Sequence, residues 1–289
     1  MSAGEMRYRV FNFSPKRGFL LSPLSARGIL EGRSEVPVNV GLEIARVYLE
    51  GDRAKVEERG IGGYVDLSLI ERLAGSDRFV FVHEGGSYFV ERREGGRYYK
   101  LRYLGERVSP TLEIDGVHMH NIVGVDPWSD ALRKISLAKV RRGDRVLDIC
   151  TGLGYTAIAS LKRGASVTTV EVSWDVLWIA EHNPFSWGLA GAKVLLGDAW
   201  DVLDELGEVY DRIIHDPPVF SHAGMLYSGD FYKKLYRRLK PGGVLFHYTG
   251  APGRRRGVKF QRGVVERLRR AGFRILRVVE GYGVVARRI

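Results

Sequence analysis

Residues 145–155 read Arg-Val-Leu-Asp-Ile-Cys-Thr-Gly-Leu-Gly-Tyr, and this stretch decides the fold. Its apolar first half predicts a buried strand over 145–149, and a helix is expected after the turn. Gly152 and Gly154 allow the backbone of the turn to approach a ligand closely, and the helix N-terminus offers free N–H groups to an anionic group. We therefore predict that a nucleotide-like cofactor binds where this strand ends.

Helices and strands alternate from Asp126 onward. Beyond 145–149, strands are expected at 166–172, 193–196, 211–215, 243–248, 275–279 and 284–287. The last two are joined by Gly281-Tyr-Gly283, which is too short for a crossover helix, so the last strand runs antiparallel to the one before it. The pattern predicts an α/β fold: a seven-stranded Rossmann-like sheet, with helices on both faces and an antiparallel last strand.

Residues 1–120 show a different pattern. Short segments that alternate apolar and polar residues are separated by glycine-containing turns, and one short helix is expected at 67–74. This is typical of a small, mostly antiparallel β domain, and it contains no recognisable catalytic motif. We therefore expect an accessory domain at 1–120 and a cofactor-binding catalytic domain at 121–289.

The composition excludes several classes of protein. With 289 residues, 45% of them apolar, the chain can bury one substantial core or two modest ones. It has no run of about 18 apolar residues and no signal-like start, so we expect a cytoplasmic protein. Cys150 is the only cysteine, which excludes an internal disulfide and a cysteine-based zinc site. Four Asn and one Gln beside many Arg and Glu are typical of a thermophile's protein.

The net charge of +11 is concentrated near the C-terminus. Residues 1–120 contain 18 basic and 17 acidic side chains, and residues 121–250 contain 15 of each. Residues 251–289 contain 12 Lys and Arg against only Glu266 and Glu280, so +10 of the charge lies there. A concentrated basic segment favours a polyanionic partner, most simply nucleic acid, although a solvated basic surface has the same composition.

The glycine turn alone fits two cofactors. Gly152-x-Gly154-x-x-Ala157 also satisfies the dinucleotide fingerprint, and Glu171 at the end of the next strand can bind a ribose in either case. Asp148 lies four residues before the first glycine, where a carboxylate suits the cationic amino group of a methionine moiety and repels a pyrophosphate. This position favours S-adenosylmethionine over a dinucleotide.

Two later strand ends favour the same cofactor. Asp198, in Gly197-Asp-Ala199 after the third strand, can accept a hydrogen bond from the exocyclic amine of adenine. The fourth strand ends in Ile214-His-Asp-Pro-Pro-Val-Phe-Ser221, which a dehydrogenase has no reason to contain.

Together these motifs resemble those of class I S-adenosylmethionine-dependent methyltransferases. The motifs that carry the resemblance are, in order, Asp148-x-x-x-Gly152-x-Gly154, Glu171 followed by Ala180-x-x-Asn183, Asp198, Asp216-Pro217-Pro218 and Leu239-Lys-Pro-Gly-Gly243. The antiparallel hairpin at the end of the chain is that fold's usual ending, and the whole chain resembles an archaeal group of predicted methyltransferases. The resemblance implies S-adenosylmethionine as cofactor, bound by Asp148, Thr151, Gly152, Gly154, Glu171, Asp198 and Ala199.

The resemblance also gives the Asp-Pro-Pro segment a catalytic role. In the amino-methyltransferases that it resembles, the acid and a backbone carbonyl beside the prolines accept hydrogen bonds from a planar amine, while an aromatic side chain stacks on the base. Asp216, Pro217, Pro218 and Phe220 take these roles here, with the aromatic residue one position later than in the commonest version. Asp-Pro-Pro-x-Phe-Ser is closer to certain large-subunit rRNA methyltransferases that modify ring positions, so both exocyclic and ring nitrogens stay open. Carbon-5 methylation is discounted, because its attacking cysteine would have to be Cys150.

A basic cluster follows the fifth strand. It contains Arg254, Arg255, Arg256, Lys259 and Arg262. The segment leaves the same carboxyl edge of the sheet as the cofactor turn, where cations suit a phosphate-rich substrate, although a solvated loop is the simpler alternative. Because the sequence has no strong major-groove reader, RNA is a better candidate than duplex DNA.

The leading hypothesis is an RNA methyltransferase that modifies a base nitrogen in rRNA or tRNA, without a metal ion or a membrane partner. An aminopropyltransferase acting on a polyamine has the same fold, and the acidic residues Asp198, Asp201, Asp204 and Glu205 favour it. The third hypothesis is an RNA-binding protein that has kept a cofactor fold, and the intact motifs argue against it.

Overall fold

The computed structural model describes residues 7–218, 223–250 and 254–289, with the backbone alone for 254–258. The chain forms two compact units. The first, called the large-sheet unit, contains Met1–Asn12, Ser129–Trp174 and Gly188–Ile289, and the second, called the small-sheet unit, contains Phe13–Trp128 and Asp175–Trp187. These units are groups of residues in close contact, and the expected division into domains at residue 120 stays a prediction.

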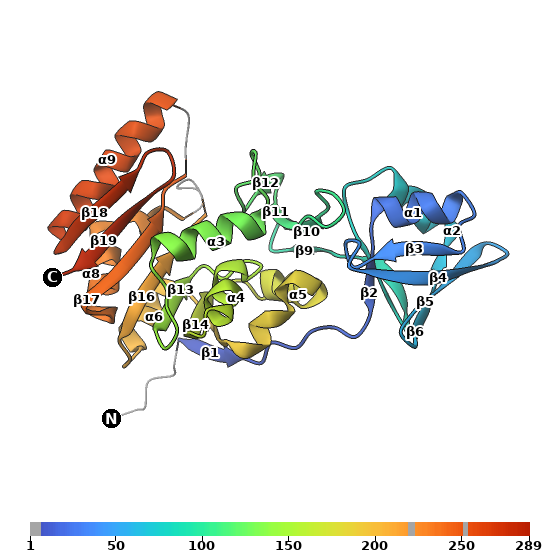
Figure 1. Ribbon diagram of the computed structural model, residues 1–289, viewed down its shortest axis with the longest axis horizontal. Helices are drawn as coiled ribbons and strands as arrows, with labels where there is room; N and C mark the ends of the chain where they lie inside the picture. Colours follow the sequence, from blue (N-terminus) through green and yellow to red (C-terminus); the bar gives the residue numbers. More distant parts are fainter. Residues whose placement is uncertain (1–6, 219–222, 251–253) are drawn as a thin grey trace. The chain divides into compact units, whose positions relative to one another are not determined.

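The large sheet has the predicted α/β topology (Figure 1). In the described residues its strand order is β1-β15-β14-β13-β16-β17-β19-β18. Its strands are β1 (Tyr8–Phe11), β13 (Arg145–Ile149), β14 (Ser166–Glu171), β15 (Lys193–Gly197), β16 (Tyr210–His215), β17 (Leu239–Tyr248), β18 (Phe273–Val279) and β19 (Gly283–Arg288). β13 to β17 are parallel, and β19 is antiparallel to both β17 and β18, which confirms the predicted ending.

Strand β1 makes the sheet one strand wider than predicted. It pairs antiparallel with β15, with Tyr8 opposite Gly197. A Cβ at Gly197 would lie 2.7 Å from the Cβ of Tyr8, so the absence of a side chain allows this pairing. The N-terminal segment therefore covers the edge that β15 would otherwise expose.

Helices of the large-sheet unit pack against its sheet. The helical elements from residue 127 onward are α3 (Pro127–Leu137), α4 (Tyr155–Lys162), α5 (Trp174–His182), η1 (Pro184–Gly191), α6 (Ala199–Glu205), η2 (Gly224–Tyr227), α8 (Gly229–Arg238) and α9 (Arg254–Arg270). Of these, α6, α8 and α9 pack side by side against the sheet. Leu147, Leu195, Val202, Phe231 and Leu268 are fully buried in this core. Removing such apolar surface from water is the main stabilising contribution to a sheet of this kind.

The small-sheet unit is mostly antiparallel β structure. Its three sheets have the strand orders β12-β11-β10-β9, β2-β7-β8 and β3-β4-β5-β6. Its strands are β2 (Phe19–Leu21), β3 (Glu35–Val38), β4 (Glu43–Glu50), β5 (Arg53–Glu58), β6 (Ile61–Asp66), β7 (Val80–His83), β8 (Gly86–Phe89), β9 (Glu91–Glu94), β10 (Arg97–Arg102), β11 (Thr111–Ile114) and β12 (Val117–His118). Its helix α2 (Leu67–Ala74) lies where the sequence predicted one, and α1 (Pro23–Leu30) was not predicted. No helix in the described part of the chain is long and apolar enough to cross a membrane.

Candidate active site

The glycine turn has the strained backbone that its sequence requires. Gly152 and Gly154 have φ angles of +55° and +77°, and Cys150 also has a positive φ of +71°. A Cβ at Gly154 would lie 2.3 Å from the side chain of Leu189, whereas a Cβ at Gly152 would contact nothing within 4 Å. The first glycine thus faces open space, and the second allows the helix to pack closely.

Glu171 holds this turn in place. Its Oε2 accepts a hydrogen bond from the Gly152 N–H at 2.9 Å, and its Oε1 accepts from the N–H groups of Val172 and Ser173 at 3.0 Å each. Burial raises the pKa of the carboxyl group, and the three N–H donors oppose that rise. An ionised carboxylate has about four acceptor positions, so one remains for a further donor such as a ribose hydroxyl.

Asp148 is fully buried at the end of β13. Its two oxygens accept hydrogen bonds from the hydroxyl groups of Thr156 and Thr169, each at 2.8 Å, and the Thr169 hydroxyl also lies 2.6 Å from that of Thr151. Burial raises the pKa of Asp148 to about 7, although both hydroxyl donors favour the ionised form. Both of these partners are neutral hydroxyl groups, so the carboxyl group is stabilised by hydrogen bonds from dipoles and not by a direct ion pair.

Asp198 begins helix α6 at the end of β15. Its side chain is exposed and accepts a hydrogen bond from the Trp200 N–H at 2.8 Å, so it is an N-cap residue. Ala199, the first residue of the helix, is buried. The Trp200 ring packs against Phe231, with 6.2 Å between centroids, and the ammonium group of Lys234 lies 4.3 Å from its centroid. Asp198 therefore presents a carboxylate to solvent at the same sheet edge as the glycine turn.

Asp216 forms an ion pair that was not predicted from the sequence. Its Oδ2 lies 2.6 Å from the ammonium group of Lys134, a residue of α3 whose side chain is only 3% exposed. Lys134 also lies 2.9 Å from Asp130 on the same helix, and Asp130 accepts a hydrogen bond from the Tyr282 hydroxyl at 2.8 Å. The Asp216 N–H donates to the Ile149 carbonyl at 3.3 Å, which places the residue beside the cofactor turn.

The charges in this group depend on one another. Burial lowers the pKa of Lys134, but the two neighbouring carboxylates outweigh it and raise that pKa overall. Burial raises the pKa of Asp216 above its ordinary value overall, while Lys134 opposes that rise and Asp130 adds to it. Lys134 is thus a fully charged group that offsets part of the cost of keeping Asp216 ionised.

Comparisons with known proteins identify the family. The methyltransferase small domain family model matches residues 115–251. An uncharacterized protein of Methanocaldococcus jannaschii is 45% identical over 240 residues, which are 81% of this chain and 82% of that protein. The chain belongs to the methyltransferase small domain family. It is an S-adenosylmethionine-dependent methyltransferase of class I, as its sequence motifs predicted.

Two other similarities cover less of the chain or show the fold alone. A tRNA (guanine(10)-N2)-dimethyltransferase of Methanothermobacter thermautotrophicus is 31% identical over 103 residues, which are 36% of this chain and 30% of that protein. The crystal structure of spermidine synthase from Thermotoga maritima is similar with a TM-score of 0.52 and 16% identity, over 68% of this chain and 71% of that one. The second similarity confirms the fold of the methyltransferase.

The turn residues fit the methyl donor. Open space lies beside Gly152, Glu171 has an acceptor position left, and Asp198 exposes a carboxylate at the end of the next strand. These three groups lie at the carboxyl ends of neighbouring parallel strands, where ligands bind in open α/β sheets.

The two prolines after Asp216 are held from η2. The Tyr227 hydroxyl donates to the Pro218 carbonyl at 2.9 Å, and Tyr227 itself is buried. Pro217 is also buried, and Pro218 is partly exposed. The predicted stacking residue, Phe220, lies outside the described residues.

His215 and His247, near the carboxyl ends of β16 and β17, are packed in the interior. His215 and His247 are fully buried, with 4.4 Å between ring centroids, and His247 contacts the Tyr232 hydroxyl through Nε2 at 2.9 Å. Burial lowers the pKa of His215 to about 4, so the ring is neutral. In the described ranges, no group of three or more His, Cys, Asp or Glu side chains is arranged to hold a metal ion.

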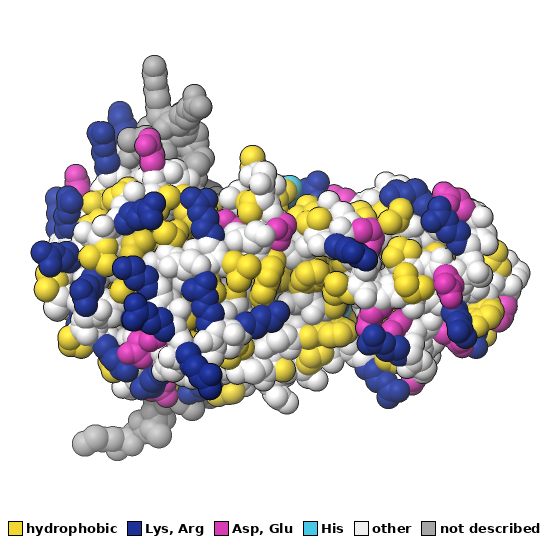
Figure 2. All heavy atoms as spheres, viewed as in Figure 1, with side chains coloured by type: hydrophobic (Ala, Val, Ile, Leu, Met, Phe, Trp, Pro, Cys, Tyr) yellow, Lys and Arg dark blue, Asp and Glu magenta, His cyan; other side chains and the backbone are white. Residues whose placement is uncertain are grey.

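Only part of the predicted basic cluster can be located. Lys259 and Arg262 are exposed on α9, whereas the side chains of Arg254, Arg255 and Arg256 lie outside the described residues. Figure 2 shows Lys and Arg side chains gathered over the part of the methyltransferase formed by α8, α9, β17 and β18. The exposed basic residues from 259 onward are Lys259, Arg262, Arg269, Arg270, Arg274, Arg277 and Arg287. None of these seven forms an ion pair with another described residue, so their charges are available to a partner.

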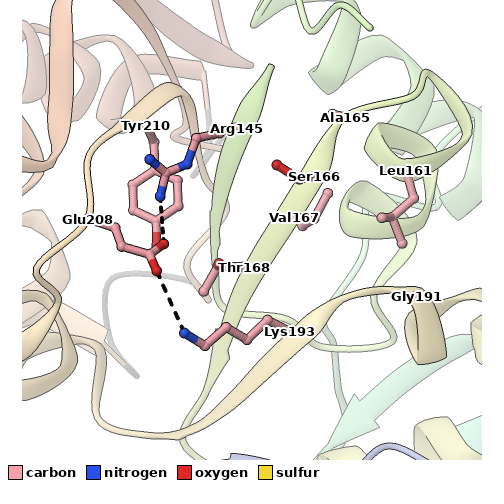
Figure 3. A pocket seen from close by; sticks show the side chains of 10 residues that line it. All are labelled: Arg145, Leu161, Ala165, Ser166, Val167, Thr168, Gly191, Lys193, Glu208 and Tyr210. Carbon is pink, nitrogen blue, oxygen red and sulfur yellow. Dashed lines mark hydrogen bonds and ion pairs between the residues drawn. The ribbon is translucent and has the colours of Figure 1, made fainter. Parts of the chain in front are cut away.

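A cleft of about 490 Å³ lies at the opposite edge of the sheet. It is lined by the amino ends of four parallel strands, and Glu208 bridges Arg145 at 2.8 Å and Lys193 at 3.9 Å across it (Figure 3). Because β13 runs from Arg145 toward the glycine turn, this cleft and the turn lie at opposite edges of the sheet.

Several residues of the site were not predicted from the sequence, among them Lys134, Asp130, Thr156, Thr169 and Tyr227. The one local signal for Lys134 is its spacing of four residues from Asp130, which places the two side chains on one face of a helix. That spacing predicts an exposed pair as readily as a buried one. Thr156 and Thr169 contact Asp148 from different elements, and no spacing rule connects them.

Proposed function

We propose that this methyltransferase modifies a base nitrogen in RNA. The observation that carries the proposal is Asp216, whose Oδ2 is held by Lys134 and whose backbone is held beside the glycine turn. Exposed cations at the C-terminal end of the chain that have no acidic partner among the described residues support a phosphate-rich substrate. The similarity to a tRNA methyltransferase over 103 residues agrees with this substrate class.

We propose the following roles for the residues of the site. Glu171 and Asp198 bind the ribose and the adenine amine of S-adenosylmethionine, and Gly152 provides the space beside them. Asp148 and Thr151 lie under its methionine end, Gly154 permits the close packing of α4, and Ala199 begins the helix beside the adenine. When bound, S-adenosylmethionine supplies an electrophilic methyl group on its sulfonium.

On the substrate side, Asp216 and the Pro217 carbonyl accept hydrogen bonds from the target nitrogen, and Phe220 stacks on the base. The rigid Pro217-Pro218 segment, held by Tyr227, fixes the direction of these acceptors. Asp216 and the Pro217 carbonyl would thereby direct the lone pair of this nitrogen toward the methyl group that bound S-adenosylmethionine would supply. The proton that the nitrogen loses is released to water. Positioning of this kind contributes much of the rate enhancement in a direct transfer.

A labelled-donor assay on bulk RNA tests the proposal. We expect the wild type to methylate total RNA, and Asp216→Ala to lose about 100-fold or more of that rate, since the acceptor is no longer fixed in line. Asp230→Ala is a matched control, because Asp230 is an exposed aspartate on α8 that pairs with Lys233. Nucleoside mass spectrometry of the product would identify the modified atom. The proposal fails if wild-type protein binds the methyl donor but methylates no RNA, or if Asp216→Ala keeps the full rate.

The basic surface can be tested separately. We expect Lys259→Ala and Arg262→Ala each to weaken RNA binding and to reduce the slope of log affinity against log salt by about one, because each removes a cation that neutralises a phosphate. Arg59→Ala, which removes an exposed arginine that pairs with Glu43 in the small-sheet unit, is the control. An unchanged slope in both variants would show that Lys259 and Arg262 do not contact the phosphates of the RNA.

An aminopropyltransferase is the second candidate. The chain is similar in fold to spermidine synthase at 16% identity, and the acidic residues Asp198, Asp201, Asp204 and Glu205 lie along α6 and its N-cap. Against it, Asp204 pairs with Lys234 and Asp201 pairs with Arg7, so these carboxylates already have cationic partners. Supplying decarboxylated donor and putrescine, in parallel with methyl donor and RNA, decides between the two activities.

A further inference from the structure

A lysine is buried between α3 and the catalytic edge of the large sheet. The side chain of Lys134 is 3% exposed, and its ammonium group lies 2.6 Å from Asp216, 2.9 Å from Asp130 and 4.3 Å from the Tyr248 ring centroid. Burying an ammonium group is costly unless it is paired, so the site is built around this charge. Lys134 comes from a helix that precedes the cofactor strand, and no sequence motif assigns it a role.

The two carboxylates beside Lys134 differ in how many of their oxygens have a partner among the described residues. Asp130 uses Oδ1 to accept from the Tyr282 hydroxyl and Oδ2 to bind Lys134. Asp216 uses Oδ2 to bind Lys134, and its side chain is 18% exposed. No donor among the described residues forms a hydrogen bond to Oδ1 of Asp216. Asp130 is thus a structural partner, whereas Asp216 keeps one oxygen for a substrate.

We propose that Lys134 is a positioning residue that keeps Asp216 ionised and fixes its rotation, so that Oδ1 alone is presented to the target base. An ionised carboxylate only accepts hydrogen bonds, whereas a protonated one also donates. The nitrogen that receives the methyl group must therefore carry a hydrogen atom that it can donate to Asp216, as an exocyclic amine does. A ring nitrogen that presents a lone pair to Asp216 is repelled. This choice of nitrogen rests on the proposed function, whereas the ionisation of Asp216 does not.

Other groups around Asp216 also influence its ionisation. Those that interact electrostatically with it are Lys134 and Asp130 from α3, Asp148 and Cys150 from β13 and its turn, Tyr227 from η2, Tyr248 from β17, and Tyr282 from the turn before β19. Lys134 is the one cation of this set. Its removal leaves Asp216 and Asp130 as neighbouring carboxylates without a cation between them, and both the partial burial of Asp216 and the second charge then raise its pKa.

Carbon-13 NMR of the aspartate carboxyl groups tests the ionisation without any substrate. The Asp216 signal is assigned from its absence in Asp216→Asn. We expect Lys134→Met to raise the titration midpoint of Asp216 by at least about one pH unit, so that the ionised fraction falls about tenfold at low pH. Adding Asp130→Asn to Lys134→Met should move the midpoint part of the way back, because it removes the second negative charge. Lys134→Arg should stay close to the wild type.

Two further variants keep the test informative if Lys134→Met folds poorly. Asp130→Asn alone leaves Lys134 in place, and it should lower the Asp216 midpoint below that of the wild type. Lys234→Met is the matched control, because Lys234 is a buried lysine of α8 paired with Asp204, away from Asp216. It should cause a similar loss of stability and leave the Asp216 midpoint unchanged. An Asp216 midpoint that moves in neither Lys134→Met nor Asp130→Asn overturns the proposal.

The pH profile of RNA methylation extends the test to catalysis. In Lys134→Met the acidic limb of kcat/KM should move to higher pH by the same amount as the NMR midpoint, whereas a purely structural loss lowers the rate equally at every pH. If the NMR midpoint moves but wild-type protein methylates no RNA, the role of Lys134 stands and the proposed function fails. If RNA is methylated on a ring nitrogen that carries no hydrogen, the inferred choice of an amine is wrong.

Discussion

The two glycines of the cofactor turn should respond differently to the same substitution. Both have positive φ angles, so an alanine costs about 1–3 kcal/mol in backbone strain at either position. At Gly154 the new Cβ would also lie 2.3 Å from the side chain of Leu189, which is fully buried. Overpacking of this kind costs about 1–3 kcal/mol more. We therefore expect Gly154→Ala to lower the free energy of unfolding by about 2–6 kcal/mol, against about 1–3 kcal/mol for Gly152→Ala.

A double-mutant cycle with Leu189→Ala separates strain from overpacking. Shortening Leu189 removes the atoms that the new Cβ would meet, so in that background Gly154→Ala should cost only the backbone strain. The difference between the two backgrounds should be about 1–3 kcal/mol, measured by urea-induced unfolding followed by tryptophan fluorescence. An equal cost of Gly154→Ala in both backgrounds would refute the packing argument.

Cofactor affinity should show the opposite order. A Cβ at Gly152 contacts no protein atom within 4 Å and projects into the space that we assign to S-adenosylmethionine. Gly152→Ala should thus weaken binding about tenfold or more, which is about 1.4 kcal/mol, as measured by isothermal titration calorimetry. Wild-type affinity in Gly152→Ala would mean that the methyl donor lies elsewhere.

Two further predictions concern polar contacts of the site. Burial raises the pKa of Asp148 from 3.8 to about 7, so the folded protein holds a proton that the unfolded chain releases between about pH 4 and pH 7. The free energy of unfolding should fall by up to about 4 kcal/mol as the pH rises through this window, and Asp148→Asn should lose that slope in urea titrations. Tyr227→Phe removes the hydrogen bond to the Pro218 carbonyl, worth about 1 kcal/mol, and should lower kcat about fivefold while the affinity for the methyl donor stays the same. An unchanged kcat would show that the prolines hold their position without Tyr227.

The fold could be predicted from the sequence because its signals are local. Strand β13 was predicted at its observed bounds, since an apolar run ends at a turn that only glycines adopt easily. The antiparallel ending followed from the length of one turn, between β18 and β19. Strand β1 could not be predicted in the same way. Its pairing depends on Gly197, which is distant in sequence and leaves room for Tyr8.

The site could be predicted only as a set of positions. The carboxyl ends of β13, β14, β15 and β16 do carry the predicted acidic residues, because parallel strands end at one edge. The contacts that determine how those residues behave come from other elements. Lys134 and Asp216 are 82 residues apart, and Asp148 and Thr169 are 21 residues apart. Such pairs depend on packing that periodicity does not encode.

The contrast between Asp148 and Asp216 shows why this matters for the chemistry. Both carboxylates lie at the carboxyl ends of adjacent strands, β13 and β16. Asp148 is bonded to two hydroxyl groups, which can serve a neutral or an ionised acid, so burial brings its pKa to about 7. Asp216 is bonded to an ammonium group, which serves only the ionised form. One strand end can thus exchange a proton near neutral pH while its neighbour stays a fixed acceptor, and distant residues on α3, α4 and β14 establish that difference.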